Sequence, residues 1–110
     1  MTILKFCQQK SEKIASRLLN VYDSSDFEIN QIEIEKEIYK TALSYSDIFL
    51  FFNVIDLEKD KEELISLVEY FTGTDKKTLQ KTPIKELIAN LIKSYTIKEL
   101  EKRNEDIIFV

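Results

Sequence analysis

The chain contains a single glycine and a single proline, which stand ten residues apart at Gly73 and Pro83. A protein of 110 residues with so few of either has almost no loops that need special backbone geometry. Gly73 suits the left-handed position just after a helix that ends at Phe71 or Thr72. Thr82 and Pro83 suit the N-cap and the first position of the next helix. The sequence therefore predicts an all-α protein with helix ends at these residues.

Apolar residues at helical spacing predict two helices in the first half of the chain. We expect the first over residues 3–22, either continuous or broken near Ser11. The second is expected over residues 26–45. Within it, residues 27–32 also alternate with the period of a half-buried strand, so both structures remain open there. From residue 33 onward we expect helix.

The longest apolar run, residues 48–55, is apolar on every face and fits either a buried strand or a buried helix. An isolated strand would leave its backbone groups unpaired, so a central helix buried on all sides is the better interpretation. We therefore expect Phe49, Phe52 and Ile55 to be buried, either within the monomer or in an oligomer interface.

In the second half of the chain, side chains that can accept a hydrogen bond from free backbone N–H groups mark the expected helix starts. They are Asp56 or Asp60 for one helix, Thr74 for a short helical turn at 75–80, Thr82 for the next helix and Thr96 for the last. Thr96 and Glu99 form a capping box, which predicts a separate terminal helix that ends near Asn104.

The length and composition predict one domain, residues 1–110, folded as a single compact bundle of four to six helices. Four tyrosines fall on or beside apolar stripes and are expected to pack in the core with their hydroxyls at its rim. They are Tyr39, Tyr45, Tyr70 and Tyr95. Cys7 is expected to be a small core side chain rather than a reactive thiol.

The lone cysteine excludes an intrachain disulfide, which favours a reducing compartment. The start of the sequence lacks the apolar region of a signal peptide. The longest apolar run is far short of the roughly 20 residues that span a bilayer. We therefore expect a soluble cytoplasmic protein that has no membrane partner.

The sequence lacks the residues that several kinds of catalytic site require. The sequence has no histidine, which excludes a Ser-His-Asp triad, a Cys/His zinc site and the His-Glu-x-x-His helix. One glycine is too few for a phosphate-binding or dinucleotide-binding loop. Five glutamates could supply carboxylates, but their spacing is typical of a surface: Glu33, Glu35, Glu37, Glu62 and Glu63. We expect no enzymatic activity, no metal and no cofactor.

The charge is distributed unevenly along the chain. The net charge is −4, and the only arginines are Arg17 and Arg103, which argues against binding to nucleic acid. From Asp23 to Glu37 there are six acids and one base, whereas Lys76 to Arg103 holds eight bases and three acids. Two solvated helix faces would explain this pattern. The alternative is a bipolar protein that pairs head to tail with a second copy or docks on a partner of matching polarity.

Two stretches are candidate partner-binding surfaces. The acidic candidates are Asp23, Asp26, Glu28, Glu33 and Glu37. The apolar candidates are the last four residues, Ile107, Ile108, Phe109 and Val110, which we expect either to dock on the body of the protein or to contact a partner. Apolar binding would be insensitive to moderate salt, whereas acidic binding would weaken as salt rises.

The stretch from Leu67 to Ile92 resembles a unit of the tail assembly chaperones of tailed bacteriophages. It has an amphipathic helix ending in Thr72-Gly73, an acidic turn at Thr74-Asp75, a following leucine and a second helix that opens at Thr82-Pro83. The resemblance covers 26 of the 110 residues and includes no catalytic residue. It implies a helical accessory protein that acts by binding another protein.

Two hypotheses of function follow. The first is a non-catalytic protein-interaction module, a phage-type or mobile-element accessory protein such as a tail assembly chaperone, which shields an aggregation-prone segment of its partner. The second is a small acidic inhibitor or immunity-type protein that blocks a basic, nucleic-acid-processing host enzyme.

Overall fold

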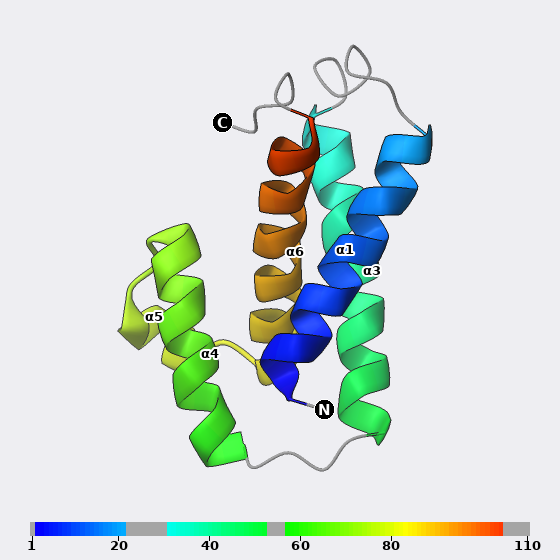
Figure 1. Cartoon of the computed structure of the whole chain (residues 1–110). Coiled ribbons are helices and arrows are strands. Elements are labelled where there is room, and N and C mark those ends of the chain that lie inside the picture. The colour runs from blue at the N-terminus through cyan, green and yellow to red at the C-terminus, as the bar shows by residue number, and fades with distance from the viewer. Residues whose placement is uncertain (1, 22–30, 53–56, 105–110) are drawn as a thin grey trace.

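The computed structural model describes residues 2–21, 31–52 and 57–104. These residues form five helices and no strand (Figure 1). The helices are α1 (Ile3–Val21), α3 (Gln31–Phe52), α4 (Leu57–Thr72), α5 (Lys76–Gln80) and α6 (Ile84–Arg103). The predicted all-α bundle of four to six helices is thereby confirmed.

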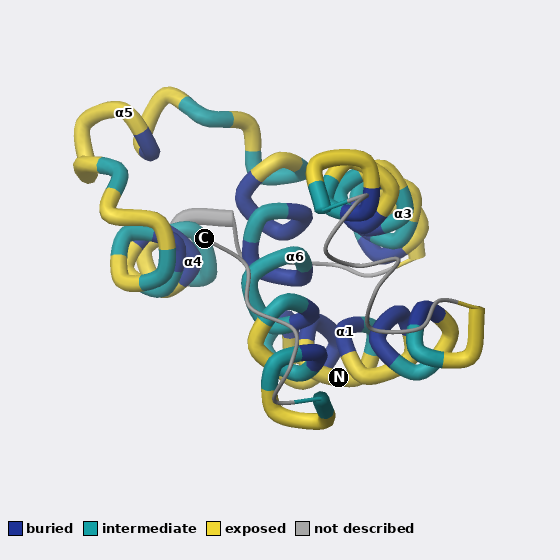
Figure 2. The backbone as a smooth tube through the Cα atoms, turned by 90° about the horizontal axis from the view of Figure 1, so that it is seen from above, coloured by how far each residue is buried: buried dark blue, intermediate teal, exposed yellow. Residues whose placement is uncertain are grey.

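Helix α6 lies at the centre, with α1 and α3 on one side and α4 on the other (Figure 1, Figure 2). Its buried residues are Leu87, Ile88, Ala89, Leu91, Ile92, Thr96 and Leu100. At about 100° per residue these positions cover more than half of the helix circumference, so α6 is packed on several sides. Figure 1 shows α1 and α6 running in the same direction and α3 running opposite to both.

The first described helix is continuous, and the second extends further toward the C-terminus than expected. Helix α1 is unbroken at Ser11, and the buried Ser11 hydroxyl donates to the Gln8 carbonyl oxygen of the same helix (2.8 Å). Helix α3 confirms helix from residue 33 onward and continues through Phe52, well past the expected end at residue 45. Residues 27–30 of the ambiguous stretch lie outside the described residues.

The prediction that residues 48–55 form the central helix is wrong. Residues Ile48–Phe52 are helical, but they form the last turns of α3 and are buried on one side only. The helix packed on several sides is α6, whose apolar residues are interrupted by lysine and glutamate and so make a less obvious apolar run.

Gly73 ends α4 as predicted. Its φ is +73°, and its N–H donates to the Glu69 carbonyl oxygen (2.8 Å). The helix that follows Pro83 begins one residue later than expected. Pro83 itself has the extended backbone of the N-cap position, and its carbonyl accepts from the N–H groups of Glu86 and Leu87. The Thr82 hydroxyl donates to the Thr78 carbonyl instead (3.0 Å).

Two further capping predictions are wrong. Asp75, not Thr74, caps α5, because its carboxylate accepts from the Thr78 N–H (2.9 Å). Thr96 opens no separate helix, since α6 continues to Arg103 and ends at Asn104 as expected. The buried Thr96 hydroxyl donates to the Ile92 carbonyl (2.7 Å), which leaves no free side chain for a capping box. Of the two aspartates expected to begin α4, Asp60 lies inside it and Asp56 lies outside the described residues.

The core is one cluster of buried apolar residues drawn from all five helices. Three small hydroxyl residues, Ser11, Ser46 and Thr96, are buried within it. Each donates to a carbonyl of its own helix, so none needs a partner on another helix. The helices are therefore held together by apolar packing.

Candidate functional site

Of the nine predicted partner-binding residues, the structure describes Glu33 and Glu37. Both are exposed on the first turns of α3, one helical turn apart. The other seven, Asp23, Asp26, Glu28 and Ile107–Val110, lie outside the described residues. The acidic candidates are thus placed in part, and the apolar C-terminal candidates are not placed.

Glu33 and Glu37 line a groove of about 510 Å³ between α1 and α3, which we call the α1–α3 groove. Its other polar lining residues are Lys13 and Arg17 on α1 and Thr41 on α3. Its apolar lining is formed by Ile14, Leu18, Val21, Ile34, Ile38 and Tyr45. The groove arises because α1 and α3 both pack along α6 and meet each other at few positions.

One place where α1 and α3 do meet is the start of α1. The ring centroids of Phe6 and Phe49 lie 4.5 Å apart. One turn further along α1, the Lys10 ammonium lies 5.1 Å from the ring centroid of Tyr45. These contacts close the pair of helices at one end, and the α1–α3 groove lies beyond them.

The two walls of the α1–α3 groove carry opposite charges. Lys13 and Arg17 stand on α1, and Glu33 and Glu37 stand on α3. Within the described parts of the chain none of these four groups forms an ion pair with another. The acidic residues therefore face a basic wall and are not part of a uniformly acidic surface. Sequence reasoning missed this wall, although Lys13 and Arg17 at a spacing of four residues beside Ile14 and Leu18 could have indicated it.

A second candidate surface is the apolar end of α3, formed by Ile48, Phe51 and Phe52. These residues are 51%, 82% and 75% exposed, and the rings of Phe51 and Phe52 contact each other edge to face at 4.9 Å. Phe49 is buried at 2% exposure as expected, but Phe52 is not buried within the monomer. In Figure 1 the last turn of α3 lies at the end of the bundle, near the start of α1. Ile55 lies outside the described residues.

The described residues include possible metal ligands and the lone cysteine. Among residues 2–21, 31–52 and 57–104, no cluster of three or more His, Cys, Asp or Glu side chains could hold a metal ion. Cys7 is fully buried in the core as predicted, and this burial raises the pKa of its thiol to about 12. A thiol with so high a pKa is not a nucleophile at neutral pH.

The four tyrosines expected to pack in the core divide into two groups. Tyr39, Tyr45 and Tyr95 are half-buried against the core as predicted, and burial raises the pKa of Tyr39 and of Tyr95. Tyr70 is the exception at 76% exposure. It stands on the outer face of α4, where the Lys98 ammonium lies 5.8 Å from its ring centroid, while its neighbour Phe71 packs on Tyr95.

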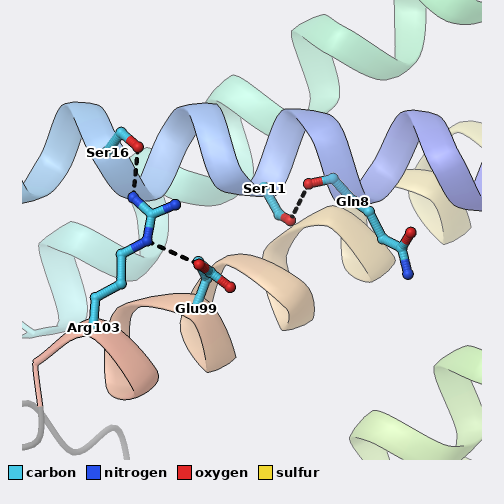
Figure 3. A network of polar contacts seen from close by, with 5 residues as sticks. All are labelled: Gln8, Ser11, Ser16, Glu99 and Arg103. Atoms are coloured by element: carbon cyan, nitrogen blue, oxygen red, sulfur yellow. Dashed lines mark hydrogen bonds and ion pairs between the residues drawn. The ribbon is translucent and has the colours of Figure 1, made fainter.

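A polar network joins Ser16 of α1 to Arg103 at the end of α6 (Figure 3). The Arg103 Nε donates to a Glu99 carboxylate oxygen (2.8 Å), and another guanidinium nitrogen donates to the Ser16 hydroxyl. Both bonds lie at the surface, where such contacts contribute little stability. The contact links α1 to α6 through surface side chains.

In the described part of the chain, no helix is long and apolar enough to cross a membrane. Comparison of the sequence and structure with protein-family models, with curated proteins and with solved structures finds no match. The argument about function therefore rests on two surfaces, the α1–α3 groove and the apolar end of α3.

Proposed function

We propose that this protein is a non-catalytic protein-interaction module that shields an apolar segment of a partner protein. The observation that carries the proposal is the exposure of Ile48, Phe51 and Phe52 at the apolar end of α3. Contiguous exposed aromatic residues on a protein surface typically mark an interaction site. A phage-type or mobile-element accessory protein, such as a tail assembly chaperone, would use a surface of this kind.

The size of this surface indicates what it binds. A phenylalanine side chain offers about 200 Å² for burial, so the three residues present roughly 400 Å² of apolar surface. This is about half of the area that each partner contributes to a stable interface between two folded proteins. The apolar end of α3 therefore suits a short apolar segment, such as the exposed part of an unassembled subunit.

A displayed library of short random peptides tests the proposal. We expect the protein to select peptides with two or more large apolar residues and to keep binding them at about 1 M salt, where charge interactions are screened. The double variant Phe51→Ser/Phe52→Ser should lose this binding with unchanged thermal stability. Tyr70→Ser is the matched control, because Tyr70 is an equally exposed aromatic residue on α4.

The opposite result would favour the acidic inhibitor. In that case the selected peptides would be basic, binding would disappear at high salt, and Glu33→Gln/Glu37→Gln would abolish it while the phenylalanine variant bound normally. A chain truncated after Asp106 separates the contribution of Ile107–Val110 from that of α3. Loss of apolar binding in this truncated chain alone would move the site to the C-terminal residues.

A further inference from the structure

We propose that the α1–α3 groove is a dimer interface, in which a second copy of this chain packs face to face with the first. The groove is self-complementary, since a basic wall on α1 stands opposite an acidic wall on α3. An interface related by a twofold axis brings the same surface of two copies together, so it needs this property. The inference is independent of the proposed function, which rests on the other end of α3.

The contacts between α1 and α3 fix which residues lie level with each other. Phe6 meets Phe49, and Lys10, one turn further along α1, meets Tyr45, one turn earlier on α3. Because the helices run in opposite directions, continuing by two more turns places Arg17 level with the position just after Glu37. Arg17 and Glu37 therefore stand at the same height on opposite walls.

The twofold axis of the dimer would run along the groove, parallel to the helices. Rotation about it leaves each residue at the same height along the helices and brings each wall of one copy over the opposite wall of the other. It places α1 of one copy over α3 of the other, so that Arg17 of each copy faces Glu37 of its partner copy. Lys13 lies one turn to one side of this pair and Glu33 one turn to the other, so each stands about one turn from an opposite charge on the partner copy. Every pair of facing helices then runs antiparallel, which is the arrangement of an up-down four-helix bundle.

The structure of the groove favours a second helical pair over a flat partner. Among the described residues, its lining comes from α1 and α3, and its apolar floor is flanked by charged groups that form no ion pair with one another. In the dimer the exposed Val21 side chains add apolar contact at the rim of the groove. The charged flanks set the register and orientation of the two copies.

Charge reversal on the two walls tests the dimer. The first variant is Lys13→Glu/Arg17→Glu, and the second is Glu33→Lys/Glu37→Lys. Sedimentation velocity over a range of concentrations at about 50 mM salt, where exposed charges are weakly screened, measures the dissociation constant. We expect the wild type to dimerise and each variant alone to dimerise at least about tenfold more weakly, because attraction becomes repulsion at both symmetric contacts.

Mixing the two variants in equal amounts is the decisive measurement. In the mixed pair each acidic α1 faces a basic α3, and each basic α1 faces an acidic α3, so dimers should return to within about threefold of the wild-type dissociation constant. Such rescue requires contact between copies. Lys76→Glu/Lys77→Glu on the exposed helix α5 is the matched control for a net charge change, and it should leave the wild-type dimer intact.

Three results would overturn the proposal. The first is a wild type that remains a monomer, or that dimerises only after truncation at Asp106, in which case another segment or partner occupies the groove. The second is a dimer that the charge variants leave intact and that Phe51→Ser/Phe52→Ser abolishes, which would place the interface at the apolar end of α3. The third is a mixture that fails to restore the dimer although both variants retain the wild-type helical content and melting temperature.

Discussion

Replacing Phe49 and Phe52 in turn by alanine separates the inner face of α3 from its exposed end. Phe49 is 2% exposed, and its ring contacts that of Phe6. Removing a fully buried phenylalanine ring costs about 3–5 kcal/mol of folding free energy. The contact between the two rings accounts for about 0.5–1.5 kcal/mol of this. Phe52 is 75% exposed, so the same change there is expected to cost no more than about 0.5 kcal/mol.

Urea unfolding followed by far-UV circular dichroism measures both costs. With a denaturant slope of about 1.5 kcal/mol per molar urea, Phe49→Ala should lower the unfolding midpoint by roughly 2–3 M. Phe52→Ala should lower it by less than roughly 0.5 M. Small domains are stable by only about 5–15 kcal/mol, so Phe49→Ala could leave little folded protein. Phe49→Leu, with an expected cost of about 1–1.5 kcal/mol, supplies a variant that folds.

A cost above about 2 kcal/mol for Phe52→Ala would refute this reasoning, because an exposed side chain cannot contribute so much. The ring would then be buried in the folded protein or in an oligomer. Repeating the measurement over a tenfold range of protein concentration distinguishes the two, since stability that comes from association depends on concentration.

Three further predictions concern single residues. Gly73→Ala should cost about 1 kcal/mol by urea unfolding, because the positive φ is strained for alanine although an added Cβ would meet no atom within 4 Å. Gly73→Asn should cost less than Gly73→Ala, because asparagine tolerates a positive φ better. Equal costs of the two variants would argue that the loss of stability does not come from backbone strain. Asp75→Ala should cost about 1 kcal/mol, because the Thr78 N–H loses its capping hydrogen bond. Asp75→Asn should retain most of the stability, because asparagine also caps helices. The Cys7 thiol should resist thiol reagents in the native protein and react in urea; rapid reaction of the folded chain would contradict its burial. Burial raises the pKa of the Cys7 thiol from 9.0 to about 12, so the thiol loses its proton at a lower pH in the unfolded chain than in the folded chain. The free energy of unfolding should therefore fall as pH rises between these two values. In Cys7→Ala this fall should be less steep.

The fold class could be predicted from the sequence because its strongest signals are local. Gly73 ends a helix through its own backbone freedom, and the apolar spacing of residues 3–22 indicates the helix observed as α1. Capping residues were less informative, because a threonine hydroxyl has two competing uses. At Thr96 it bonds to a carbonyl of its own helix, and at Thr82 it bonds to the preceding turn. Sequence alone does not decide between these uses.

The candidate site was harder to predict, because exposure depends on contacts between helices that are distant in the sequence. Apart from Asn53, residues 48–55 are apolar, and nothing local distinguishes buried Phe49 from exposed Phe52. Phe49 contacts Phe6 on α1, which is 43 positions away in the sequence. Glu33 and Glu37 were correctly expected on one exposed helix face, but their basic counterparts lie on α1, and only the packing of both helices on α6 brings the four charges together.

The order of the helices along the chain has a consequence for biosynthesis. Helix α6 is the last of the described helices to be made, yet α1, α3 and α4 all bury apolar residues against it. The hydrogen bond between Arg103 and Ser16 joins residues 87 positions apart. At about 5–20 residues per second, α6 is completed roughly 4–16 s after α1. During that time the apolar faces of the earlier helices have no central helix to cover them, so a nascent chain that stalls before residue 84 is exposed to aggregation and proteolysis. Most of the native packing forms only when α6 emerges, and closing such long loops slows folding relative to a bundle of sequential helical hairpins.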